Sequence, residues 1–164
     1  MRTMRLTRIL FLLVPVALIA ALSTRIHGAP SSPEIAVVVN SANPVSAISL
    51  ADLRKIYMGE RVYWKSNSAI VLLMRSSGSP EREVILRVVY QMSEQQYTHY
   101  WIAKVMRAEA SDPPVALYSH GMVFEGVKGN PGAIGYVDAH DVRAGMKVLR
   151  IEGLLPGDPG YPLH

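Results

Sequence analysis

The sequence predicts a three-layer α/β/α domain, in which helices cover both faces of a mixed, mostly parallel sheet. Short runs of β-branched and other apolar residues, typical of buried strands, alternate along the chain with segments of helical periodicity. Serine, proline and glycine mark the boundaries between these segments. No internal repeat or low-complexity stretch interrupts this order.

The first segment has the composition of an export signal. Arg2, Arg5 and Arg8 precede the apolar run Ile9–Leu22, and no acidic residue accompanies them. A membrane-spanning helix needs about 20 apolar residues, more than this run contains. Residues 1–23 are therefore predicted to be a signal peptide, with an uncleaved N-terminal anchor as the alternative.

The predicted cleavage point lies after Ser23, and Ala29 is a second candidate. Residues 24–34 are rich in small residues and proline and are expected to form a flexible leader. The chain has no cysteine, which excludes disulfides and a lipid-modified N-terminal cysteine. We therefore expect a periplasmic or secreted protein with no stable membrane span after cleavage.

The positive charge of the chain belongs to this N-terminal segment. Four of the 17 basic residues precede Pro30, whereas all 13 acidic residues follow it, so the remainder is formally neutral. Nucleic-acid binding requires clustered Lys and Arg that displace counterions from phosphates. The sequence contains no such cluster, which excludes this class of partner.

The first half of the domain is expected to contain two strands and two helices. Ile35–Val39 is a β-branched run typical of a buried strand. Ser49 is placed to cap a helix over Leu50–Tyr57. Ile70–Met74 is predicted to be the second strand. Pro80 suits the first position of the helix that follows it, with Ser79 as the cap.

The second half continues the alternation. Ser93 is expected to cap a helix that runs to about Ala110, and Ser119 to open another through Val127. Ala133–Val137 and Lys147–Ile151 are predicted strands. We expect one domain over residues 35–153, followed by an extended C-terminal tail over residues 154–164.

The polar loop between the second strand and its helix is the predicted ligand site. Backbone N–H groups at a helix start, serine hydroxyls and guanidinium groups all donate hydrogen bonds to anions. Ligands of open α/β sheets also tend to bind at the carboxyl ends of strands. A plain capped turn is the alternative interpretation. The predicted anion-binding residues are Arg75, Ser77, Gly78, Ser79 and Arg82.

Several motifs in register resemble the phosphate-binding proteins of ATP-driven phosphate transporters. They extend from Glu34 to about Gly153 and include the loop Arg75-x-x-Gly78-Ser79-x-x-Arg82. The other matching segments are Ile35–Asn40, Asn43-Pro44-Val45, Ile48–Leu50, Leu53–Gly59, Trp64, Tyr100-Trp101, Pro113-Pro114 and Asn130–Val137.

This resemblance implies one lobe of the type II periplasmic binding-protein fold and a non-enzymatic role in binding phosphate or a similar small oxyanion. It implies no cofactor. It further implies an ABC permease as a possible partner, and a single lobe would need a homodimer or a partner lobe to cover its ligand. We therefore expect weak or partner-completed anion binding.

The loop departs from the family pattern at two positions. The family's loop usually continues Gly-Ser-Gly-Thr, whereas here Pro80 removes a backbone donor and Glu81 adds a negative charge. The acidic ligand of full-length members also has no counterpart. The alternative function is therefore a periplasmic interaction or adaptor module that has lost ligand capture.

Other chemistry finds little support in the sequence. His99, His120 and His140 show no metal-ligand spacing, so no metal site is predicted. The cluster from Asp138 to Asp141 follows a strand and is interpreted as a solvated turn. No nucleophile motif is present, and no catalytic residue is predicted.

Overall fold

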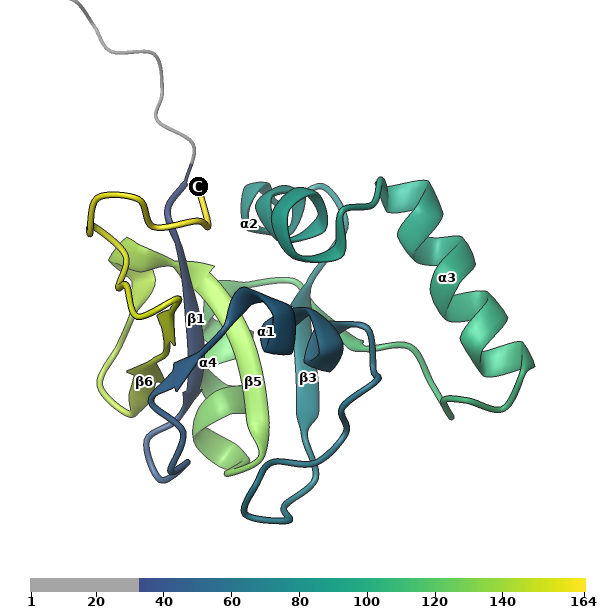
Figure 1. Cartoon of the computed structure of the whole chain (residues 1–164), viewed down its shortest axis with the longest axis horizontal. Coiled ribbons are helices and arrows are strands. Elements are labelled where there is room, and N and C mark those ends of the chain that lie inside the picture. The colour runs from purple at the N-terminus through teal and green to yellow at the C-terminus, as the bar shows by residue number, and fades with distance from the viewer. Residues whose placement is uncertain (1–32) are drawn as a thin grey trace, which may run out of the picture. The chain divides into compact units, whose positions relative to one another are not determined.

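A five-stranded sheet in the order β4-β3-β5-β1-β6 forms the centre of the protein, and a smaller sheet pairs β2 with β7 (Figure 1). The computed structural model describes residues 33–164, so the predicted signal peptide and most of the predicted leader lie outside the described residues. The strands are β1 (Ile35–Asn40), β2 (Ala47–Ile48), β3 (Val71–Arg75), β4 (Val115–Leu117), β5 (Ala133–Asp138), β6 (Met146–Val148) and β7 (Arg150–Ile151). The helices are α1 (Leu50–Tyr57), α2 (Pro80–Ile85), α3 (Glu94–Met106) and α4 (His120–Gly129), with a π-helical segment η1 (Leu86–Tyr90) and a 3-10 turn η2 (Ala139–Asp141).

The directions of the strands decide where the candidate site lies. β3 runs parallel to both of its neighbours, β4 and β5, whereas β1 runs antiparallel to β5 and β6. The mixed sheet predicted from the sequence is therefore confirmed. Because parallel strands end at the same edge of a sheet, the carboxyl ends of β3, β4 and β5 lie side by side.

Two hydrophobic cores, one on each face of the sheet, give the domain its three layers. Alternate residues of β1 enter opposite cores, with Val37 and Val39 on one side and Ala36 and Val38 on the other. Helices α1 and α2 and segment η1 cover the first face, and α4 covers the second (Figure 1). The predicted three-layer architecture is confirmed.

Serine caps begin three helices at the predicted positions. The hydroxyl of Ser49 accepts from the N–H of Asp52, and that of Ser119 accepts from the N–H of Met122. Ser93 forms a reciprocal capping box with Gln96. Each serine hydroxyl accepts from the N–H three residues later, so each cap can be recognised from the sequence alone.

The sequence missed several short or irregular elements. β2 and β4 were not predicted, because strands of two or three residues leave no recognisable alternation. The predicted strand Lys147–Ile151 is divided at Leu149, since β6 pairs with β1 and β7 with β2. Helix α3 ends at Met106 rather than near Ala110, and Ala108 then adopts a left-handed conformation with φ of 55°.

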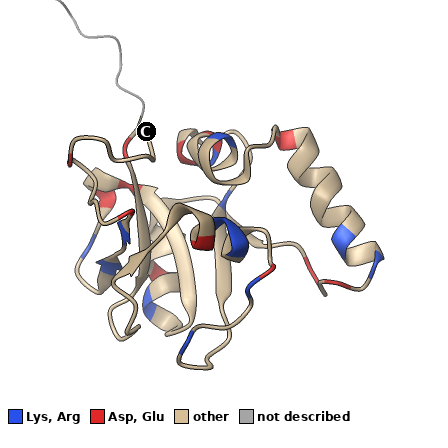
Figure 2. Cartoon of the chain, in the orientation of Figure 1, with Lys and Arg blue, Asp and Glu red and all other residues tan. Residues whose placement is uncertain are grey.

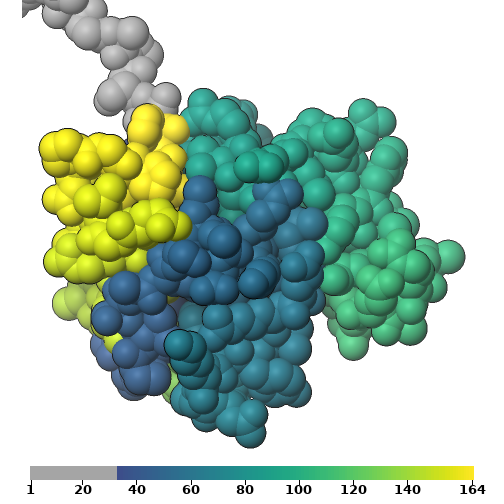
Figure 3. Space-filling model, viewed as in Figure 1, coloured from purple at the N-terminus to yellow at the C-terminus, as the bar shows by residue number. Residues whose placement is uncertain are grey.

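The C-terminal segment 154–164 contains turns but no helix or strand, and it forms part of the surface in the view of Figure 3. The backbone N–H of Ile35 donates to the carbonyl of Leu163, and the Tyr161 hydroxyl donates to the carbonyl of Ile35. Tyr161 and Leu163 are both buried. None of the helices within residues 33–164 is long and apolar enough to cross a membrane.

Candidate functional site

Arg75, the last residue of β3, lies at the common edge of the three parallel strands and is only 8% exposed. Its guanidinium donates to the carbonyl of Leu117, at the end of β4, at 3.1 Å. Its backbone N–H donates to the hydroxyl of Tyr136 in β5 at 3.0 Å. Two neighbouring strands therefore hold Arg75 at the start of the polar loop, β5 through its backbone and β4 through its guanidinium.

The Glu81 carboxylate faces Arg75 from the first turn of α2, and Glu81 is 5% exposed. One carboxylate oxygen, Oε2, lies 3.6 Å from Nε of Arg75. The other, Oε1, lies 2.6 Å from Nε2 of His120, the first residue of α4. Glu81, which was expected from the sequence to disfavour an anion, thus has a buried carboxylate inside the bend. The basic side chains of Arg75 and His120 lie on either side of it.

The electrostatic surroundings favour the ionised form of this carboxyl. Burial alone would raise the pKa of the Glu81 carboxyl, but its own backbone N–H, His120 and Arg75 together hold the pKa below its ordinary value. Glu81 is therefore a charged group at neutral pH. Its negative charge offsets the positive charge of Arg75.

His120 extends this ionic chain to a fourth residue. Its Nδ1 contacts the carboxylate of Asp141 in η2, which follows β5. Exposure increases outward along the chain, from 7% for the side chain of Glu81 to 28% for His120 and 36% for Asp141. Arg75, Glu81, His120 and Asp141 thus alternate basic and acidic groups from the interior to the surface.

Arg82 lies on a different side of α2 and has a complete set of partners. Its guanidinium binds the Glu94 carboxylate through two hydrogen bonds of 2.8 and 2.7 Å and donates to the carbonyl of Arg75 at 2.8 Å. It also stacks over the ring of Tyr97 at 4.4 Å. Burial opposes its charge, but the Glu94 carboxylate raises the pKa of Arg82. The cation in the first turn of the helix is therefore explained by Glu94.

The remaining predicted ligands differ in accessibility. Ser77 and Gly78 are exposed, and Gly78 uses a φ of 82° that suits a residue without a side chain. Ser79 is buried and occupies the N-cap position of α2, but its hydroxyl makes no cap bond. Among the described residues, Oγ of Ser79, Nε of Arg75 and Oε2 of Glu81 are all buried without a hydrogen-bond partner. Such unpartnered buried polar groups are rare in folded proteins.

The structure brings Arg75 and Ser79 to one buried bend, leaves Ser77 and Gly78 at the surface beside it, and turns Arg82 toward Glu94. The contacts of His120 with Glu81 and Asp141 were not predicted from the sequence. His120 follows β4, which was not predicted, and Asp141 follows β5; both strands pair with β3 in parallel.

The other sequence candidates have structural explanations. His140 pairs with Asp138 at the exposed end of β5, as expected of a solvated turn. Tyr97 and Trp101 are buried core residues. Within residues 33–164, no group of three potential ligands is arranged to hold a metal ion. Basic and acidic positions are interspersed over the fold in the view of Figure 2.

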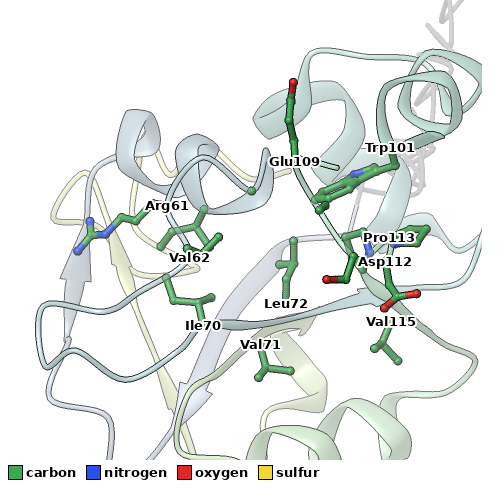
Figure 4. A pocket seen from close by; sticks show the side chains of 15 residues that line it. Arg61, Val62, Ile70, Val71, Leu72, Trp101, Glu109, Asp112, Pro113 and Val115 are labelled. Atoms are coloured by element: carbon green, nitrogen blue, oxygen red, sulfur yellow. The ribbon is translucent and has the colours of Figure 1, made fainter. Parts of the chain in front are cut away.

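A separate apolar pocket of about 470 Å³ lies between α1, β3 and α3. Val62, Leu72 and Trp101 point toward one another across it (Figure 4). Val62 and Val115, which line its mouth, are each about half exposed. The pocket shares no lining residue with the Arg75 bend.

The profile of a protein family described as "PBP superfamily domain" matches residues 33–151, most of the chain. The chain belongs to the PBP superfamily. A comparison with curated protein sequences gives no match.

Solved structures share the fold of this PBP domain. A phosphate ABC transporter substrate-binding protein of Clostridium perfringens, solved with bound phosphate, gives a TM-score of 0.62 at 23% identity over 76% of this chain and 47% of that chain. An ABC-type phosphate transport receptor of Vibrio cholerae gives 0.61 at 21% identity over 76% and 48%. PstS of Borrelia burgdorferi gives 0.62 at 17% identity over 80% and 54%. These matches confirm the predicted resemblance at the level of the fold.

The PBP domain described here spans about half the length of these solved relatives. About half of each relative therefore lies outside the aligned region.

Proposed function

We propose that this PBP domain is an exported binding protein for a small oxyanion of the phosphate type, that it works outside the cytoplasm without catalysing a reaction, and that its affinity is weak or is completed by a partner. The solved relatives are phosphate-binding components of ABC transport, which supports this ligand class and makes an ABC permease the proposed partner. The permease would receive the ligand from the domain.

The observation that carries the proposal is the buried polar bend at the carboxyl edge of three parallel strands. Arg75 supplies a fixed cation there, and the hydroxyl of Ser79, a buried residue of the same bend, has no partner among residues 33–164. Exposed Ser77 and Gly78 form the accessible side of the bend. A guanidinium and hydroxyl donors are the groups that recognise oxyanions.

Two features support weak affinity. The Glu81 carboxylate already neutralises Arg75, and a second anion near it is repelled. A single lobe also encloses a small ligand on fewer sides than a closing cleft does. A partner lobe that covers the bend would supply the missing contacts.

Titration calorimetry with inorganic phosphate tests the proposal. The mature domain is expected to bind phosphate weakly, and Arg75→Ala is expected to abolish the heat. Arg143→Ala, which removes an exposed arginine elsewhere, is the matched control and should bind as the wild type does. A folded wild-type domain that gives no heat at millimolar phosphate would overturn the proposal.

That negative result would favour the second candidate, an interaction or adaptor module without ligand capture. The specific observation in its favour is that both loop arginines have carboxylate partners within the domain, Glu81 for Arg75 and Glu94 for Arg82. In such a module the ionic contacts would serve only to hold the bend in shape.

Export itself is tested on the mature protein. We predict that mass spectrometry of the protein recovered from the cell envelope or medium gives an N-terminus at Thr24, or at Pro30 if cleavage follows Ala29. An intact N-terminus beginning at residue 1 would contradict cleavage and favour the uncleaved anchor.

A further inference from the structure

The Arg75–Glu81 contact differs from an ordinary structural ion pair. Its closest atoms are 3.6 Å apart, beyond hydrogen-bond distance, and both of these atoms lack a hydrogen-bond partner among the described residues. The pair is nevertheless deeply buried, with side-chain exposures of 10% and 7%. A buried pair is stabilising only when hydrogen bonds satisfy its remaining atoms, which this pair does not achieve.

A carboxylate is itself an oxyanion, with the same charge sign and acceptor atoms as phosphate. In this bend the Glu81 carboxylate lies against the guanidinium that an external oxyanion would use. We propose that Glu81 is a built-in counter-anion that occupies the oxyanion position of the bend, so that an external oxyanion binds only by displacing it. This inference rests on the proposed function and specifies how that site is restrained.

His120 and Asp141 hold the counter-anion in place. His120 donates to Oε1 of Glu81 at 2.6 Å through Nε2, and its Nδ1 is engaged by Asp141. The His120 ring thus contacts both carboxylates at once, one through each nitrogen. These two residues, the His120–Asp141 clamp, are partly exposed, so a partner protein or a covering lobe could reach them.

The free energy needed to displace the Glu81 carboxylate limits the affinity for an external oxyanion. An incoming anion must move Glu81 away from Arg75 or accept its repulsion at a distance of a few ångströms. Glu81 is therefore the residue that limits oxyanion affinity in this domain. Its replacement by a neutral residue of the same size should remove the charge that competes for Arg75, so that phosphate displaces the side chain more easily.

The test compares inorganic phosphate titrations of the wild type, Glu81→Gln and Glu83→Gln at neutral pH. Glu83 lies two residues along the same helix, but its side chain is exposed, so its replacement changes the net charge equally and leaves the Arg75–Glu81 contact intact. Glu81→Gln is expected to bind phosphate at least about tenfold more tightly than the wild type, and Glu83→Gln to match the wild type. Thermal unfolding confirms that each variant is folded, and Glu81→Thr replaces Glu81→Gln if the latter is not.

The outcomes separate this inference from the proposed function. Wild-type binding that Glu81→Gln does not strengthen would overturn the counter-anion and leave the proposed function standing. A wild type that gives no heat beside a variant that binds would support the counter-anion and overturn phosphate capture by the natural protein. No heat from any folded variant would overturn both.

Discussion

Two arginines seven residues apart meet carboxylates in opposite ways. Arg82 and Glu94 form a two-bond pair at 2.7 and 2.8 Å, and the same guanidinium also binds a backbone carbonyl and an aromatic ring. Arg75 and Glu81 are more buried as a pair, yet they lie 3.6 Å apart with unpartnered atoms on both sides, within the described part of the chain. The Arg82–Glu94 pair has the geometry of a structural ion pair. The Arg75–Glu81 pair has that of a binding site whose anion is supplied by the protein.

The largest expected effect comes from Arg82. Arg82→Ala should lower the free energy of unfolding by about 3 kcal/mol, because it removes a buried cation and leaves the carbonyl of Arg75 without its donor. Denaturant unfolding measures the change. Arg107→Ala breaks an exposed pair with Glu109 and should leave the free energy of unfolding close to that of the wild type. Similar losses of unfolding free energy in both variants would show that the Arg82–Glu94 pair is no more stabilising than the exposed Arg107–Glu109 pair.

A smaller effect is expected at His120. His120→Ala should cost about 2 kcal/mol, because the buried Glu81 carboxylate loses a charge-assisted hydrogen bond. The matched control is His140→Ala, since His140 also pairs with a carboxylate but its side chain is 93% exposed. That control should be close to neutral in the same unfolding experiment. A His120→Ala variant as stable as the control would show that the clamp contributes nothing.

The smallest expected effect is the pH dependence carried by Glu81. Since the pKa of Glu81 is lowered in the folded protein, its ionisation stabilises the fold above the pKa of the unfolded chain, ordinarily 4.5, and this contribution is lost as pH falls through the lower folded value. The wild type should therefore lose stability more steeply than Glu81→Gln below about pH 4.5. Unfolding curves between about pH 6 and 3 measure the difference, with Glu83→Gln as the control. Parallel pH profiles for the wild type and Glu81→Gln would contradict the lowered pKa.

The elements that the sequence predicted well depend on residues close together in the chain. Ser49, Ser93 and Ser119 cap helices whose N–H donors lie three residues away, so each cap could be recognised before any contact was known. The buried strand β1 was equally recognisable, because six consecutive residues are covered on both faces and all but the last are apolar. These features set the fold class.

The candidate site depends instead on residues that are far apart in sequence. Glu81 and His120 are 39 residues apart and meet only because β4, a strand of three residues after two prolines, runs beside β3. The direction of the Glu81 side chain could not be predicted either, since a residue in the first turn of a helix can face the sheet or the solvent. The sequence therefore located the bend and two of its buried groups, Arg75 and Ser79, but not the carboxylate that fills it.

A crystal structure of Glu81→Gln grown with inorganic phosphate tests the central claim most directly. The account predicts phosphate in the bend, within hydrogen-bond distance of Nε of Arg75 and Oγ of Ser79, with the side chain at position 81 moved aside. A bend without phosphate, in which that side chain still lies against Arg75, would contradict it.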